Sequence, residues 1–170
     1  MSMTVFYKAN KAIEKAVKER EVEGKKVMRK LRKAMRDHGA DDVYADHWSL
    51  AFSYFIFKEK PDSKIWKKKG KGYTPKLNSN EGKKLHMKLK KINESIYPLN
   101  KNLLKVCGFE KGPFFTGTHI IRRPQLLRCK DDSTLVGYNP NVLEHKGFVL
   151  PKGLKELKYS ETKKLTEKKK

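Results

Sequence analysis

The stretch Ser49–Phe57, SLAFSYFIF, decides the fold class of this chain. Its side chains alternate between two faces, and both faces are apolar, which is typical of a strand buried in the middle of a sheet. The short run Asp42–Asp46 precedes it and predicts a neighbouring strand. Asp46-His47 would form the tight connection, so we expect an adjacent strand pair in the core.

Helical periodicity precedes this pair. Residues 4–37 are predicted as one long helix, because apolar side chains from Phe6 to Met35 recur at helical spacing. Gly24 lies on the same stripe, where it either breaks the helix or lets a neighbouring element approach closely. His38-Gly39 supplies the expected stop.

Two further helices are predicted after the pair. Leucine and isoleucine residues form an apolar seam over 79–97, and Pro98 is expected to end that helix. A shorter helix, Asn100–Val106, is expected to be capped by Asn100 and closed by Gly108.

The C-terminal third contains short β-rich runs, namely Thr118–Arg123, Gln125–Cys129, Thr134–Tyr138 and Phe148–Leu150. Lys130–Ser133 is expected to be a hairpin loop. Residues 160–170 are almost all charged or polar, so they can bury little surface and are expected to be a disordered basic tail. The predicted fold class is α+β: a long N-terminal helix and one or two further helices packed on an antiparallel sheet, in a single domain over 1–159.

Net charge is the strongest functional signal. The chain of 170 residues carries 41 Lys and Arg against 19 Asp and Glu, a net charge of +22, with an isoelectric point near 9.9. A surplus of this size is typical of proteins that bind nucleic acid. Of the basic residues 34 are Lys and seven are Arg, a ratio that codon usage in an AT-rich genome also produces. Since Lys contacts phosphates as a point charge, the composition favours backbone contacts over sequence readout.

The most basic segment is Lys58–Lys91, in which thirteen Lys oppose three acidic residues. Its first part lacks periodicity and is interrupted by Pro and Gly, so we expect a Lys-rich loop over 58–80. Trp66 and Tyr73 flank the central lysines and are candidates for stacking on unpaired bases, although for Trp66 a place at the edge of the core is favoured. The binding residues predicted in this segment are Lys67, Lys68, Lys69, Lys71, Lys83, Lys84, Lys88 and Lys91.

Two other basic groups extend the predicted nucleic-acid-binding surface. The second half of the long helix adds Arg29, Arg32, Lys33 and Arg36. Arg122 and Arg123 follow a β-rich run, and two guanidinium forks suit a phosphate or a carboxylate. An ion pair with Asp131 or Asp132 explains that arginine pair equally well.

Signals for catalysis are weak. The five His residues form neither HExxH nor a Cys/His pattern with metal-ligand spacing. Asp42, Asp46 and His47 come nearest to a metal-dependent nuclease site, but Asp residues in a turn commonly hydrogen-bond their own backbone. Cys107 and Cys129 lack CxxC spacing and indicate neither a zinc site nor a disulfide. We therefore expect no enzyme, no catalytic residues, no metal and no cofactor.

The segments DDVYADHWSLAFSYFIF (41–57) and PDSKIW (61–66) resemble those of small accessory proteins encoded by phages and prophages of Proteobacteria. The resemblance covers about residues 40–70 and includes no catalytic motif. It implies a compact, highly charged protein of a mobile element. Such proteins often bind host machinery, and many inhibit nucleic-acid enzymes or defence systems.

Two main functional hypotheses follow. The first is a basic accessory protein that binds DNA or RNA with low sequence specificity. The second is an inhibitor, of the anti-CRISPR or anti-restriction type, that docks on a host protein through exposed aromatic anchors. The anchor candidates are Trp48, Trp66, Tyr73, Phe114 and Phe115. A structural component of a virion or ribosome fits the charge as well.

The expected location is the cytoplasm, which would be the host cytoplasm for a phage protein. Met1–Tyr7 leads directly into a charged amphipathic segment and has no secretory signal pattern. The longest nearly unbroken apolar stretch, Trp48–Phe57, is about half the length that a membrane helix requires. We therefore expect no membrane partner.

Overall fold

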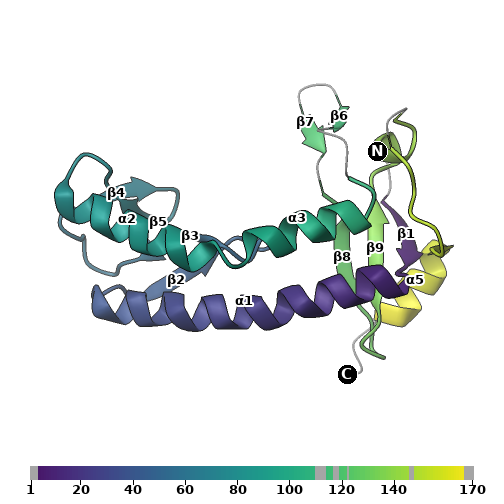
Figure 1. The fold of residues 1–170 in the computed structure, drawn as a ribbon, viewed down its shortest axis with the longest axis horizontal. Helices are drawn as coiled ribbons and strands as arrows, with labels where there is room; N and C mark the ends of the chain where they lie inside the picture. The colour runs from purple at the N-terminus through teal and green to yellow at the C-terminus, as the bar shows by residue number, and fades with distance from the viewer. Residues whose placement is uncertain (1–3, 110–113, 117–118, 122, 146–147, 167–170) are drawn as a thin grey trace. The chain divides into compact units, whose positions relative to one another are not determined.

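The computed structural model describes residues 4–109, 114–116, 119–121, 123–145 and 148–166. They form a mixed α+β structure, as the sequence predicted, with helices and antiparallel sheets (Figure 1). The chain divides into two compact units, one made of Met1–Glu19 with Lys101–Lys170 and the other of Arg20–Asn100. The single domain over 1–159 stays a prediction.

The unit Arg20–Asn100 contains the strand pair from which the sequence argument began. Its four-stranded antiparallel sheet has the order β2-β3-β5-β4. Its elements are the second part of α1 (Lys11–Asp37), β2 (Asp42–Ala45), β3 (Phe52–Ile56), β4 (Trp66–Lys69), β5 (Gly72–Pro75), α2 (Asn80–Asn93) and the start of α3 (Tyr97–Val106).

Burial of apolar side chains between the helices and this sheet holds the unit together. Phe55 of β3 is fully buried with Trp66 of β4, and both pack into one cluster with side chains of α1 and α2. The buried helix residues of this cluster are Val27, Leu31, Ala34, Leu85 and Leu89. Fully burying one such side chain contributes about 1.5–3 kcal/mol, so this cluster stabilises the unit.

A register shift in the central pair refines the predicted alternation. Tyr44 pairs with Tyr54, whereas the next residue, Ala45, pairs with Phe52, so Ser53 is an extra residue in β3. A bulge of this kind changes the face on which the following side chains lie. As a result, Phe52 lies beside Phe55, with ring centroids 4.8 Å apart.

Gly24 allows a close approach rather than breaking the helix. α1 continues through it, and a Cβ atom at this position would lie 2.6 Å from Cδ1 of Leu50. Of the two alternatives that the sequence left open for Gly24, the structure selects close packing.

The other unit is built around a second antiparallel sheet of order β10-β1-β9-β8. Its buried side chains include Leu135, Val136 and Tyr138 of β9. The Tyr138 hydroxyl donates a hydrogen bond of 2.8 Å to the backbone carbonyl of Cys107. Its elements are β1 (Val5–Lys8), the start of α1, the rest of α3, β6 (Phe114–Thr116), β7 (His119–Ile121), β8 (Gln125–Arg128), β9 (Thr134–Tyr138), α4 (Pro140–Leu143), β10 (Lys155–Glu156) and α5 (Tyr159–Thr166).

The ends of the chain differ from prediction. Val5–Lys8 is strand β1, paired with β9 and β10, and the long helix begins only at Lys11. Asn10 caps that helix, because its side-chain oxygen accepts a hydrogen bond of 2.9 Å from the Ile13 amide. Tyr159–Thr166 is helix α5, so the prediction of a disordered tail over 160–170 is wrong for 160–166, and 167–170 lie outside the described residues.

Three internal predictions also need correction. The segment expected to be a loop over 58–80 contains the β4–β5 hairpin. α2 ends at Asn93 rather than Tyr97, and Pro98 lies in the first turn of α3, where its missing amide hydrogen costs nothing. Phe148–Leu150 forms no strand.

Candidate nucleic-acid interface

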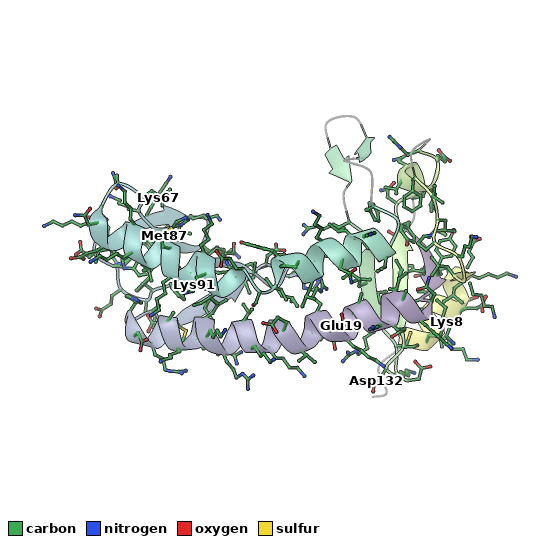
Figure 2. The ribbon with its side chains drawn as sticks, in the orientation of Figure 1. Lys8, Glu19, Lys67, Met87, Lys91 and Asp132 are labelled. Carbon is green, nitrogen blue, oxygen red and sulfur yellow. The ribbon has the colours of Figure 1, made fainter. Side chains whose placement is uncertain are left out.

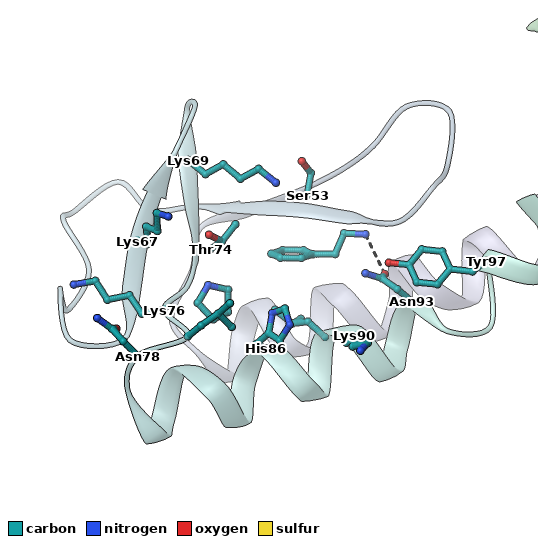
Figure 3. Close-up of a pocket in the computed structure, with 14 residues that line it drawn as sticks. Ser53, Lys67, Lys69, Thr74, Lys76, Asn78, His86, Lys90, Asn93 and Tyr97 are labelled. Carbon is teal, nitrogen blue, oxygen red and sulfur yellow. Dashed lines mark hydrogen bonds between the residues drawn. The ribbon is translucent and has the colours of Figure 1, made fainter. Parts of the chain in front are cut away.

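A basic groove opens in the unit Arg20–Asn100 between the sheet and α2 (Figure 3). Its volume is about 880 Å³. The lining combines apolar side chains with four lysines, a histidine and several neutral polar groups. The lining residues are Phe52, Ser53, Lys67, Lys69, Thr74, Pro75, Lys76, Leu77, Asn78, His86, Leu89, Lys90, Asn93 and Tyr97.

The β4–β5 hairpin positions two of these lysines. Strand alternation places successive side chains of β4 on opposite faces. Trp66 is buried in the core and the Lys68 ammonium lies 5.8 Å from the centre of the Tyr73 ring, whereas Lys67 and Lys69 line the groove. Gly70, at a backbone φ of +57°, makes the tight turn that returns the chain to β5.

Helix α2 supplies the opposite wall. Ser79 caps it, since its hydroxyl oxygen accepts a hydrogen bond of 3.1 Å from the Gly82 amide. Leu85 and Leu89 face the core. Helical geometry then puts His86, Lys90 and Asn93 together on one flank of α2, and all three line the groove.

A side-chain hydrogen bond joins this helix to the sheet. Asn93 is buried, and its side-chain oxygen accepts a bond of 3.0 Å from the Phe52 amide, drawn as a dashed line in Figure 3. Because Phe52 opens β3, this bond fixes the start of the central strand against α2. It therefore ties β3 to α2 at a place where both residues line the groove.

The charged side chains that line the groove are all basic among the residues that the structure describes. No Asp or Glu is among the described residues that line it. Within the part of the chain that the structure describes, the ammonium groups of Lys67, Lys69, Lys76 and Lys90 form no ion pair. Four positive charges without local neutralisation make a favourable site for an anion with several phosphates.

The lysines of this unit that were predicted to bind nucleic acid do not lie at one place. Lys67 and Lys69 line the groove, and Lys71 is exposed in the hairpin turn. Lys88 lies 4.0 Å from the Asp37 carboxylate. Lys68, Lys83, Lys84 and Lys91 are exposed but do not line the groove; Lys91 projects from α2 in Figure 2.

The predicted arginines also lie away from the groove. Arg29, Arg32, Lys33 and Arg36 are exposed on α1 and do not line it. Arg123 is exposed in the other compact unit, and Arg122 lies outside the described residues.

The two stacking candidates belong to the packed side of the sheet. Trp66 is only 6% exposed and makes edge contacts with the rings of Phe55, Phe57 and His38. It is therefore a core residue, and its prediction as a base-stacking platform is wrong. Tyr73 is half-buried against the Phe57 ring, on the face opposite the groove lysines.

Of the other anchor candidates of the docking hypothesis, the structure describes the side chain of Trp48 but not those of Phe114 and Phe115. Trp48 is half-buried, with the Arg20 guanidinium 4.7 Å above its ring. The backbones of Phe114 and Phe115 form β6, but their side chains lie outside the described residues.

Sequence reasoning missed the groove residues that come from beyond the hairpin, namely Lys76, His86, Lys90, Asn93 and Tyr97. The spacing of His86, Lys90 and Asn93 at i, i+4 and i+7 was a readable signal that one helix flank is polar. Only the packing of that flank against the hairpin reveals that it faces Lys67 and Lys69.

Asp46, in the β2–β3 connection, and Asp42, the first residue of β2, both accept hydrogen bonds from nearby backbone amides. The Asp46 carboxylate accepts hydrogen bonds from the amides of Trp48 and Ser49, at 3.2 and 2.8 Å. Asp42 accepts one from the Val43 amide. In the described part of the chain, no three His, Cys, Asp or Glu side chains gather as a metal ion would require.

None of the helices that the structure describes is long and apolar enough to cross a membrane. Comparison with known proteins adds no family to this picture. No protein-family model, no curated protein and no solved structure matches the chain.

Proposed function

We propose that this protein binds nucleic acid with low sequence specificity through the basic groove of the unit Arg20–Asn100. One observation carries the proposal: the side chains of Lys67, Lys69, Lys76, Lys90 and His86 line a single cavity that has no carboxylate among its described lining residues. Lysine ammonium groups contact phosphates without reading base edges, which favours backbone binding.

The groove also offers space and apolar surface for more than a bare phosphate. A cavity of about 880 Å³ lies in the range of sites that hold drug-sized molecules. Phe52, Leu77 and Tyr97 line it between the charged groups, so a base or a sugar has apolar contacts available. Phosphate, sugar and base together match this mixture of charged and apolar lining.

The test compares two variants that remove equal charge. The first changes Lys67, Lys69, Lys76 and Lys90 to Gln, and the matched control changes four exposed lysines of the same unit outside the groove, Lys25, Lys30, Lys60 and Lys64. Binding of labelled DNA and RNA, single-stranded and duplex, is followed by fluorescence anisotropy at several salt concentrations.

The groove variant is expected to lose most of its affinity, while the control keeps most of it. If all four lysines contact phosphates, the slope of log K against log salt becomes shallower by up to about 3 in the groove variant. Equal losses in the two variants would show that net charge alone drives binding. Absence of binding to every probe at low salt would refute the proposal.

A second candidate function, docking on a host protein as an inhibitor, is favoured by apolar side chains beside the lysines. Leu77 is 57% and Met87 59% exposed, and Tyr97 is 48% exposed. Protein interfaces commonly use such anchors within a polar rim. Changing Met87, which does not line the groove, to Ser would weaken capture of such a partner and leave nucleic-acid binding unchanged. The groove lysine variant would do the reverse if the first function is correct.

A further inference from the structure

Two tyrosines of the sheet form an aromatic stack that the groove itself does not include. Tyr44 of β2 and Tyr54 of β3 are directly paired across the strands. Their ring centroids are 4.9 Å apart with an angle of 14° between the ring planes. Tyr44 is 44% exposed, although a large aromatic side chain on an edge strand gains stability from burial. An exposed, pre-stacked ring offers a face for a further planar group.

This stack lies on the same sheet face as the groove lysines. Gly72 is directly opposite Lys69 in the β4–β5 pair. A Cβ atom at Gly72 would overlap the Tyr54 ring. Directly opposed residues of an antiparallel pair point to one face, so the Tyr54 ring covers Gly72 on the face that carries Lys69, and Lys67 shares that face by alternation.

The face is therefore divided into an aromatic part and a cationic part. Tyr44 and Tyr54 lie on β2 and β3, and Lys67 and Lys69 lie on β4. Gly72, which has no side chain, lies between them on β5. The strand order makes β2 and β4 three inter-strand spacings apart, about 14 Å. A phosphate on Lys69 and a base on Tyr44 would thus come from different nucleotides of one strand.

We propose that the preferred ligand of this face is single-stranded nucleic acid, with one base stacked on the Tyr44–Tyr54 pair and the adjoining phosphates on Lys67 and Lys69. This inference rests on the proposed function and specifies the form of nucleic acid. A duplex hides its base faces inside the helix, whereas a single strand presents them, and stacking on aromatic rings tolerates any sequence. The geometry selects single strands without reading bases.

The test distinguishes the contribution of the Tyr44 ring to binding from that of its hydroxyl group and from any loss of folding. Tyr44→Leu removes the aromatic face but keeps an apolar side chain on the edge strand, and Tyr44→Phe keeps the ring. Tyr159→Leu is the matched control, because Tyr159 is 71% exposed and lies in the other unit. Each full-length variant is titrated with a single strand and with a duplex of equal length, after thermal unfolding has shown that it folds.

We expect Tyr44→Leu to weaken single-strand binding by about 5- to 100-fold, the range found when one stacking residue is removed. Duplex binding should change less than twofold, and Tyr44→Phe and Tyr159→Leu should bind as the parent does. If Tyr44→Leu leaves single-strand affinity intact while the groove lysine variant abolishes it, the stacking inference is wrong and the proposed function stands. A duplex preferred over the single strand would also overturn the inference.

Discussion

Replacement of Asn93 by Ala tests the hydrogen bond that joins α2 to the central strand. The substitution removes the acceptor that lies 3.0 Å from the Phe52 amide. An unpaired, partly buried amide costs about 1–3 kcal/mol, and the lower half of that range applies here because the adjoining groove admits water. The free energy of unfolding should fall by about 1–2 kcal/mol, which for a unit of this size lowers Tm by roughly 5–15 °C.

The matched control is Asn78→Ala. Asn78 lines the same groove but is exposed, so its removal should change the free energy of unfolding by no more than about 0.5 kcal/mol. Thermal unfolding followed by circular dichroism, with urea titration as a second probe, measures both variants. Equal effects of the two substitutions would refute the conclusion that Asn93 fixes β3 against α2.

Three other predictions concern packing, a buried hydroxyl and pH. Gly72→Ala should destabilise the protein by about 1–3 kcal/mol in urea titration, because its methyl group would overlap a tyrosine ring and a backbone carbonyl oxygen of β3. Tyr138→Phe should cost about 1 kcal/mol, since it removes the buried hydrogen bond from the Tyr138 hydroxyl to the Cys107 carbonyl; unchanged stability would contradict that role. Partial desolvation, and secondarily the nearby Lys88, lower the pKa of His38 below its ordinary 6.5, against the opposing effect of Asp37. The unfolded chain therefore binds the proton more readily, so stability should decline as the pH falls through 6.5 and below, and His38→Gln should flatten that decline in Tm measured from pH 5 to 8.

The central strand pair shows which features of a strand the local sequence pattern can predict. Alternating apolar residues predicted strands at Asp42–Asp46 and Ser49–Phe57, and the structure contains β2 and β3 there. Apolar alternation is local and strong in this stretch, so it predicts the strand without tertiary information. The extra residue at Ser53 was not predictable, because a bulge depends on the register with β2.

The hairpin β4–β5 was missed for an equally physical reason. Three of the four residues of β4 are Lys, so the strand has no apolar alternation beyond Trp66. Its stability comes from pairing with β5 and from the burial of Trp66 in a core whose other members are distant in sequence. Tertiary context here overrides local propensity.

The N-terminus illustrates the opposite error. Phe6 lies at helical spacing from the apolar residues of α1, which favoured one continuous helix. Residues Val5–Lys8 instead pair with β9 and β10, more than a hundred residues away in sequence. A run of four residues cannot distinguish the two periodicities, and the Asn10 cap decides where the helix begins.

The sequence by itself determined the mixed fold class, the central strands, the helical segments and the strong positive charge. The charge follows from composition, and the helices and strands follow from the spacing of apolar residues over short segments of the chain. Only the tertiary structure decided which lysines line one cavity. Lys67 and Lys69 come from the hairpin, whereas Lys76 and Lys90 follow it in the loop and in α2, and the groove exists because packing against the core brings these segments face to face. Net charge follows from the composition of the chain, whereas the placement of these lysines around one groove depends on tertiary packing.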